Sequence, residues 1–346
     1  MIIKKVKSLL YYLIIFGLIL VIGGCPYEDD DDNDDDVICS GKPSECFNPL
    51  YGWSFEGKVI DEPYLFDVTV VKLDDGRYRL YGEDNQYSST HVEHAIVSYV
   101  SDDGLQLQKE DGNRLTGNLY MPFVVKLSDG KFRLYYTKMG NKKSIRSAIS
   151  EDGLTFTIEE GDRLTSDGSS YESEGVGRQK IMQLSDGSYR MYYIGYGENG
   201  HDRILSAVSE DGLDWTREEG IIIDPSDLCP PATGIGNSVP FMTSDGVYHL
   251  YIVTGTCEEN YKDEKWGIFD ATSPDGLTFT FSDEPIIENY FKAESYTGDP
   301  TDPAVMPQDP AAIMTNEGMR MYFFIGDGPE VIEESAIYSL MNENIT

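Results

Sequence analysis

Short stretches of alternating apolar and polar residues, separated by Asp-Gly turns, recur along this chain. The clearest is Asp186–Tyr193, where an Asp-Gly turn follows the largely apolar run Ile181–Leu184 and leads into alternating aromatic and polar residues. Glycine accepts the positive φ of a tight turn, so the pattern predicts a β-hairpin. Related copies start at four other positions, and the five turn glycines lie 54 to 72 residues apart: Gly76, Gly130, Gly187, Gly246 and Gly318. Five copies predict five repeated units.

A second phrase, Ser-x-Asp-Gly-Leu, follows the hairpin in the first four units. Its copies begin at Ser101, Ser150, Ser209 and Ser273, and short strand patterns precede and follow each copy. One unit therefore contains four antiparallel strands, which is the content of one propeller blade. We predict an all-β fold, a five-bladed β-propeller of four-stranded antiparallel blades, in which the Asp-Gly turns and aromatic residues serve turn formation and packing.

The ends of this region predict how the ring closes. The fifth unit stops at its third strand, Ser335–Met341, whereas Tyr51–Phe55 resembles an isolated fourth strand. We predict that Trp53–Lys58 completes the last blade and removes an exposed sheet edge. The propeller would then span residues 51–346.

Residues 1–24 have the pattern of an export signal. A lysine-rich start precedes the apolar run Leu9–Ile22, which is short for a membrane span, and small residues lead to Cys25. This end resembles the lipobox of bacterial lipoproteins, which implies lipidation of Cys25 and attachment to the cell envelope, at the outer membrane. The alternative is an ordinary secretory signal with a chance cysteine.

Residues 25–50 are interpreted as a tether and a cysteine loop. Glu28–Asp36 is almost entirely acidic, and a like-charge run of this kind stays extended and solvated. Four cysteines remain beyond Cys25, and an even number in an exported chain predicts disulfides. Three pairings are possible, of which we favour Cys39–Cys46 and Cys229–Cys257.

Composition excludes some partners. The chain has 61 acidic and 27 basic residues, for a net charge of -34, which argues against nucleic acid and against direct binding to anionic lipid heads. Membrane contact would come from the lipid anchor only. The histidines, His91, His94, His201 and His249, lack the spacing of a zinc site and are interpreted as surface or packing residues. We expect no metal, no cofactor and a monomer.

The repeated phrases carry a family resemblance. Asp-Gly-x-Tyr-Arg-x-Tyr-Tyr, followed by Ile-x-x-Ala-x-Ser-x-Asp-Gly-Leu-x-Phe, resembles the five-bladed propeller superfamily of arabinanases, β-xylosidases, invertases and levansucrases, over about residues 51–341. The resemblance implies a central funnel in which a first-blade Asp is base or nucleophile and a third-blade Glu is the acid. A second Asp, often from the second blade, orients substrate or tunes the acid.

Candidate site residues follow from one equivalent position. The residue nine places before each turn glycine is Asp67, Met121, Arg178, Asn237 or Asp309. Asp67 matches the family's first-blade carboxylate; the alternative is an Asp that caps a strand end. Met121 departs from the family, because a carboxylate is common there.

The third blade also departs from the family, because Arg178 occupies the equivalent position. Glu174, four residues earlier and followed by Gly as in the family, is the candidate general acid, although its loop can equally leave it in solvent. Arg178, Asn237 and Asp309 are assigned to substrate binding. Arg178 would either keep Asp67 and Asp309 ionised or hold an anionic sugar by a bidentate pair.

Three classes of function remain. The first is glycan hydrolysis by Asp67 and Glu174, the second a propeller that binds a glycan or a protein without catalysis, and the third a structural envelope lipoprotein. The fold alone does not choose among them.

Overall fold

The computed structural model describes residues 52–62, 64–84, 94–225, 235–256, 265–282, 285–288, 306–327 and 331–345. Residues 1–51 and all five cysteines lie outside these ranges, and with them the predicted signal, lipidation site, tether and disulfides. Within the described ranges, no helix has the length and apolar character to span a bilayer.

The described strands form five antiparallel sheets, each with four strands from the centre outward. Blade 1 contains β2 (Leu65–Lys72), β3 (Tyr78–Asp84), β4 (His94–Ser101) and β5 (Gln108–Lys109), with β6 (Leu115–Gly117) paired to β4. Blade 2 contains β7 (Leu119–Lys126), β8 (Phe132–Lys138), β9 (Ser144–Ser150) and β10 (Thr157–Ile158). Blade 3 contains β11 (Gly175–Gln183), β12 (Tyr189–Tyr196), β13 (Arg203–Ser209) and β14 (Thr216–Arg217).

Blade 4 contains β15 (Ile235–Met242), β16 (Tyr248–Thr256), β17 (Lys265–Ser273) and β18 (Thr280–Phe281), with β19 (Ile287–Glu288) paired to β17. Blade 5 contains β20 (Met306–Met314), β21 (Met319–Asp327), β22 (Val331–Asn342) and β1 (Ser54–Ile60). Two short 3₁₀ turns, η4 (Ser170–Glu172) and η5 (Glu198–Gly200), flank β11 and β12.

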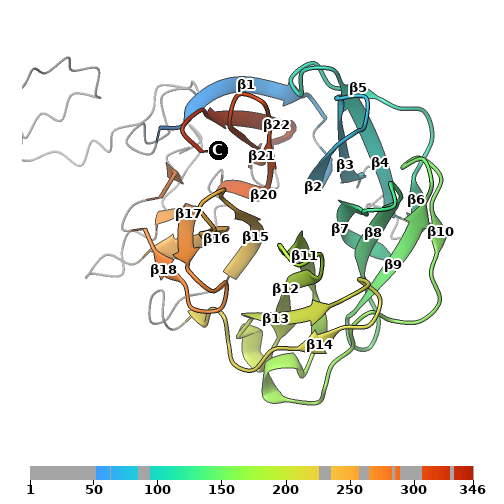
Figure 1. Ribbon diagram of the computed structural model, residues 1–346, viewed down its shortest axis with the longest axis vertical. Helices are drawn as coiled ribbons and strands as arrows, with labels where there is room; N and C mark the ends of the chain where they lie inside the picture. The colour runs from blue at the N-terminus through green and yellow to red at the C-terminus, as the bar shows by residue number, and fades with distance from the viewer. Residues whose placement is uncertain are drawn as a thin grey trace, which may run out of the picture. The chain divides into compact units, whose positions relative to one another are not determined.

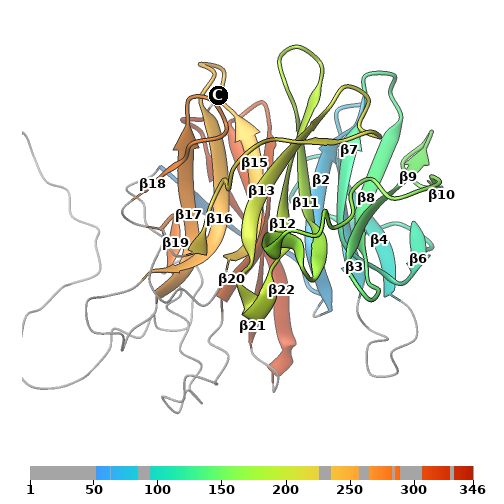
Figure 2. The ribbon, with the colours of Figure 1, turned by 90° about the horizontal axis from the view of Figure 1, so that it is seen from below.

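The five blades surround a central axis, with β2, β7, β11, β15 and β20 innermost (Figure 1). Seen from the side, these inner strands run along the axis, so their ends meet at a common face (Figure 2). The structure thus confirms the predicted five-bladed β-propeller, and all five predicted hairpins form.

The ring closes through the N-terminal strand, as predicted. β1 pairs antiparallel with β22, with Phe55 opposite Leu340 and Lys58 opposite Tyr338. The strand begins and ends one to two residues later than the predicted Trp53–Lys58. Blade 5 therefore joins residues from both ends of the propeller sequence, and its outer edge is covered.

The hydrophobic core is divided into five clusters, each between two neighbouring blades. Between blades 2 and 3, for example, Tyr135 and Ile145 pack with Val176, Met191 and Tyr193. Because apolar side chains alternate along each strand, both faces of a blade can be buried against its neighbours. Burial against two neighbours explains why the hairpin strands are so rich in aromatic residues.

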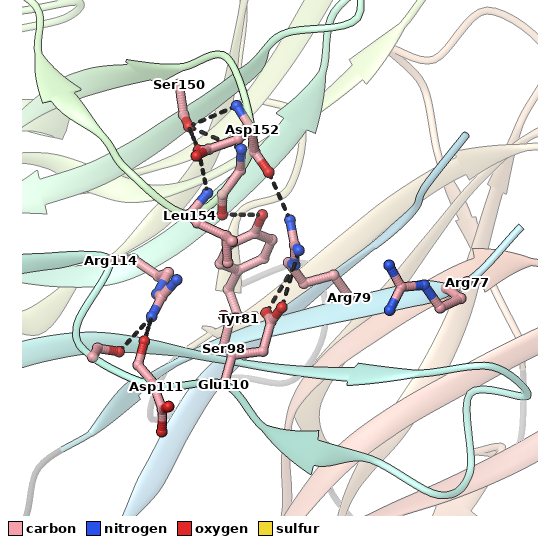
Figure 3. A network of polar contacts seen from close by, with 12 residues as sticks. Arg77, Arg79, Tyr81, Ser98, Glu110, Asp111, Arg114, Ser150, Asp152 and Leu154 are labelled. Atoms are coloured by element: carbon pink, nitrogen blue, oxygen red, sulfur yellow. Dashed lines mark hydrogen bonds and ion pairs between the residues drawn. The ribbon is translucent and has the colours of Figure 1, made fainter. Parts of the chain in front are cut away.

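Polar contacts that we call latches join neighbouring blades, and Figure 3 shows the one between blades 1 and 2. Arg79 on β3 donates to the backbone oxygen of Asp152 in blade 2 (2.9 Å) and pairs with Glu110 of its own blade (2.8 Å). The Tyr81 hydroxyl donates to the backbone oxygen of Gly153 (2.8 Å). Equivalent latches start from Arg133 and Tyr135, Arg190 and Tyr192, and Arg320 and Tyr322.

The receiving turn explains the phrase Ser-x-Asp-Gly-Leu. Asp152 accepts the backbone N–H groups of Leu154 and Thr155 at 2.8 Å each, and Ser150 accepts that of Gly153. Gly153 has a φ of +72°, and a Cβ there would lie 2.6 Å from Arg79 Nη1. The glycine is thus required twice, for the turn and for the approach of the latch.

Blade 4 carries a different junction. His249 replaces the arginine and pairs with Asp270 at 3.0 Å, while Tyr251 packs edge-on against Trp53 at the start of the closing strand. Apolar contact replaces the hydrogen-bonded latch where the two ends of the propeller meet.

Candidate functional site

The five inner strands share a β-bulge near the axis. Each shows a register shift against its neighbouring strand at the equivalent place. Four residues there have a left-handed φ between 48° and 56°: Asp67, Met121, Arg178 and Asp309. Such a φ is uncommon outside glycine and costs about 1–3 kcal/mol. These are four of the five positions selected from the sequence by counting back from the turn glycines.

Asp67, Asn237 and Asp309 form a hydrogen-bonded cluster, which we call the central triad. Asn237 Nδ2 donates to Asp67 Oδ1 at 2.6 Å and to Asp309 Oδ1 at 3.0 Å. The backbone N–H of Asp67 donates to Asp309 Oδ2 at 3.2 Å. Blades 1, 4 and 5 are therefore joined at the axis by side chains that are 8%, 2% and 7% exposed. Asp67 is not a strand cap, since its carboxylate bonds to a side chain of another blade.

Asp67 has an unusual protonation equilibrium. Burial raises its pKa to about 8, and the neighbouring carboxylate of Asp309 acts in the same direction. Arg178 and Lys180 lower the pKa of Asp67, but by less. The expectation that Arg178 keeps Asp67 ionised is thus wrong, because desolvation outweighs the charge of the guanidinium.

Two cations of blade 3 lie beside the central triad. The charges of Asp67 and Asp309, together with the Tyr196 hydroxyl, raise the pKa of the partly exposed Arg178 against the opposing effect of burial. Lys180 is 1% exposed, and its Nζ has no hydrogen-bond partner among the described residues. Nζ lies 5.4 Å from the Phe123 ring centroid, and burial lowers the pKa of this amine.

Met121 is held in place by three neighbours. Its backbone N–H donates to Glu83 Oε2 at 2.9 Å, and its carbonyl oxygen accepts from Gln179 Nε2 at 2.8 Å. The Tyr196 hydroxyl lies 3.8 Å from its sulfur. The second blade therefore presents a fixed thioether at the ring position where a carboxylate was expected by resemblance.

Glu83 and His94 form a pair that the sequence analysis missed. Glu83 is 2% exposed, and its Oε1 lies 2.6 Å from His94 Nδ1. The imidazole packs against the Tyr120 ring with centroids 4.1 Å apart. A signal existed in the sequence: seven residues after the turn glycine, blades 3 to 5 carry an apolar residue, whereas blades 1 and 2 carry Glu83 and Thr137.

His94 belongs to an outer row of polar residues at the start of the third strand. Glu83 pairs with Ile96, Thr137 with Ile145, and Ile194 with Ile204. Two residues before these partners stand His94, Lys143 and Asp202 in blades 1, 2 and 3. Lys143 Nζ lies 4.0 Å from the Tyr196 ring centroid. Burial raises the pKa of the half-buried Asp202.

The candidate acid Glu174 lies apart from the central triad. Its side chain is exposed, and no hydrogen bond or ion pair within the described ranges joins it to Asp67. Its neighbour Glu172 is 1% exposed and is bound by Arg217 (2.7 Å) and by the Tyr193 hydroxyl (2.9 Å). Glu172 is thus an ion-paired structural residue, and the predicted pairing of Glu174 with Asp67 rests on the sequence alone.

The residues that the structure describes contain no group of three His, Cys, Asp or Glu side chains that could hold a metal ion. The central triad consists of two carboxyl groups and an amide, and the basic side chains of Arg178 and Lys180 lie beside it. Its arrangement suits proton transfer and hydrogen bonding to a polar ligand.

Comparisons with known proteins identify the fold. The sequence matches no protein-family model, and no curated protein shows significant sequence similarity to it. Among solved structures, the chain is similar to a thermostable family-43 glycoside hydrolase (TM-score 0.58, 17% identity, 80% of this chain and 88% of the other covered). The chain is also similar to an endo-arabinase from Bacteroides thetaiotaomicron (TM-score 0.61, 13% identity, 85% of this chain and 98% of the other covered). A third is a glycosyl hydrolase from Bacteroides ovatus (TM-score 0.55, 16% identity, 85% and 87% covered).

At these identities the likeness concerns the fold, and it agrees with the resemblance carried by the repeated phrases. This chain therefore has the five-bladed β-propeller fold found in family-43-type glycoside hydrolases.

Proposed function

We propose that the protein acts on a glycan at the centre of the propeller, as a glycoside hydrolase whose proton donor is Asp67. One observation carries the proposal: a buried carboxyl with a pKa of about 8 lies next to a second carboxylate, and Asn237 holds both. Asp67 thus keeps its proton near neutral pH, as a general acid must. Asp309 replaces Glu174 as the second member of the pair.

The separation of the pair favours one stereochemical course. Asp67 Oδ1 and Asp309 Oδ1 both accept a hydrogen bond from Asn237 Nδ2. The distance between these two oxygens therefore cannot exceed the sum of the two hydrogen-bond lengths. This upper limit on the distance between the two Oδ1 atoms lies below the carboxyl separation of roughly 6.5–9.5 Å in inverting enzymes, so it favours the shorter separation, roughly 5–5.5 Å, of retaining enzymes.

The reaction then has two steps. Asp67 gives its proton to the glycosidic oxygen while the bond to the anomeric carbon breaks and an Asp309 oxygen bonds to that carbon. Water then attacks the same carbon, its proton passes to Asp67, and the bond to Asp309 breaks. The sugar leaves with its original anomeric configuration.

The test is hydrolysis of aryl glycosides and of plant and bacterial oligosaccharides by residues 51–346. Asp67→Asn and Asp309→Asn should each reduce kcat by about 10²-fold or more, and NMR should show the retained anomer first. Glu174→Gln serves as the comparison and should keep most of the activity. Loss of activity in Glu174→Gln, with activity retained in Asp309→Asn, would instead support the pair of Asp67 and Glu174 that was predicted from the sequence.

A second candidate is glycan binding without hydrolysis. It is favoured by Met121 and Arg178 at ring positions of blades 2 and 3, and by Asp309, whose two oxygens both accept hydrogen bonds from the protein. Binding of oligosaccharides by calorimetry, with no turnover of any substrate by the wild type, would support it.

We also propose that the chain is exported and anchored through a lipid on Cys25. The support is the sequence pattern of residues 1–24 and the acidic run behind them. Cys25→Ser should abolish fatty-acid labelling and release the protein from the envelope fraction. Non-reducing peptide mapping should recover Cys39 with Cys46 and Cys229 with Cys257.

A further inference from the structure

Two cations and an imidazole surround Met121 in a very acidic chain. The chain has 27 basic residues against 61 acidic ones. Yet His94, Lys143 and Arg178 are all linked to Met121 through one intermediate residue. His94 packs on Tyr120, which adjoins Met121 in β7. Lys143 lies over the ring of Tyr196, whose hydroxyl lies beside the Met121 sulfur, and Arg178 interacts electrostatically with the same tyrosine.

We propose that this cluster, the Met121 subsite, binds the carboxylate of an acidic sugar, a uronic acid residue of the glycan. The proposal rests on the proposed action on glycans and names the class of sugar. Arg178 presents a planar fork suited to a carboxylate, and Lys143 adds a compact charge. Tyr120 is partly exposed and provides aromatic surface for the sugar ring.

The site is built from fixed parts. Met121 is anchored at its N–H by Glu83 and at its carbonyl by Gln179, and Tyr196 is buried. Glu83 also binds His94 Nδ1, which orients the imidazole and leaves Nε2 as its second ring nitrogen. Because the polar groups are held before the ligand arrives, little ordering opposes binding.

Of the acidic groups near the subsite, Glu83 and Asp309 are hydrogen-bonded to the protein, and Asp67 favours the protonated form. Glu83 accepts from Met121 and lies against His94, so both its oxygens have partners. The pKa of Asp202 is raised, and that of Asp67 is about 8. The pKa of Arg178 is raised, so its charge persists throughout the neutral range. Lys143 and Arg178 are the cations that an incoming carboxylate would meet, whereas Asp309, which also faces Arg178, has both oxygens hydrogen-bonded to Asn237 and to the Asp67 backbone.

The experiment is calorimetric titration of the full-length protein with matched acidic and neutral probes at pH 7. The probes are trigalacturonate and its fully methyl-esterified form, and a glucuronate-bearing xylotriose and its methyl ester. We expect at least one acid to bind about tenfold or more tightly than its ester, as loss of a charge-assisted hydrogen bond predicts. Binding of neither acid more tightly than its ester overturns the proposal.

Lys143→Met removes one charge and should weaken binding of the acid about fivefold or more without affecting the ester. Lys142→Met is the matched control, because Lys142 is exposed and bonds only to Ser166 among the described residues. Equal losses in both variants overturn the subsite, since they indicate a general charge effect. Lys143→Arg should restore acid binding if Lys143→Met also lowers stability. Selective binding of the acid without hydrolysis of any substrate would support the subsite and overturn only the proposed hydrolysis.

Discussion

The latches and the five β-bulge positions of the inner strands recur at equivalent places in successive blades. The latches repeat the same residues from blade to blade, whereas the bulge positions do not. Four latches use the same Arg, Tyr and Asp-Gly turn, with the same partners. The five bulge positions carry Asp, Met, Arg, Asn and Asp. Repetition is expected where every junction needs the same stability. Variation at strained positions facing one axis is expected where the blades together build one asymmetric site.

The two regions also treat their aspartates in opposite ways. In the latches, hydrogen bonds from backbone N–H groups and from serine lower the pKa of Asp103 and of Asp275 to about 2. In the ring, burial raises the pKa of Asp67 to about 8. The exposed turns favour the charged carboxylate, whereas the axis favours the neutral acid. Stability and chemistry therefore place different demands on the same residue type.

Deleting residues 52–60 should have the largest effect. It removes β1, re-exposes the edge of β22 and takes Glu56 away from the latch residue Arg320. We expect no cooperative unfolding transition in calorimetry and loss of dispersion in the NMR spectrum. Removal of residues 1–50 is the control and should leave the unfolding transition unchanged. An intact transition in the deletion variant would show that the fifth blade does not need its closing strand.

Arg79→Ala should destabilise the protein by about 3 kcal/mol, because it leaves the mostly buried Glu110 carboxylate without its cation and with only the Ser98 hydroxyl as a partner. Arg77→Ala is the matched control two residues away, where an exposed arginine pairs with Asp75 and contributes little. Urea denaturation measures both. Equal losses in the two variants would contradict the distinction between latch and surface arginines.

Gly153→Ala should lower the free energy of unfolding by more than Gly130→Ala, although both glycines have a positive φ. A Cβ at residue 153 meets Arg79 and Tyr81, whereas nothing lies within 4 Å at residue 130. We expect a loss of about 1 kcal/mol at residue 130 from the backbone alone and about 3 kcal/mol at residue 153, where crowding adds to it. Thermal unfolding of the two variants measures both losses. Equal losses of stability would show that Arg79 and Tyr81 can move to accommodate the added Cβ.

The last prediction concerns pH. The folded pKa of Asp67 lies above its unfolded value, so Asp67 should reduce stability progressively as pH rises from about 4 to about 8. The latch aspartates have lowered values, so their contribution should be lost as pH falls from about 4 to about 2. Asp67→Asn should remove only the first dependence, making the variant relatively more stable at pH 8. Unchanged slopes in urea denaturation between pH 4 and 8 would contradict the raised pKa.

Much of the fold was determined by the sequence alone. Asp-Gly turns and alternating residues are local signals, and their five copies predicted the blades, the hairpins and the closing strand. Counting nine residues back from each turn glycine also found all five bulge positions, because a repeated unit places equivalent residues at equivalent points.

What those positions do was decided only by the tertiary structure. Asn237 bridges Asp67 and Asp309, which lie 170 and 72 residues away in sequence, and Glu83 reaches Met121 across a blade junction. The pKa of Asp67 depends on burial and on Asp309, neither of which is a property of its own neighbours in the chain. Local patterns set the architecture, whereas contacts between blades set the charge and hydrogen bonding at the axis, because electrostatic interactions depend on distance in space and not on separation along the chain.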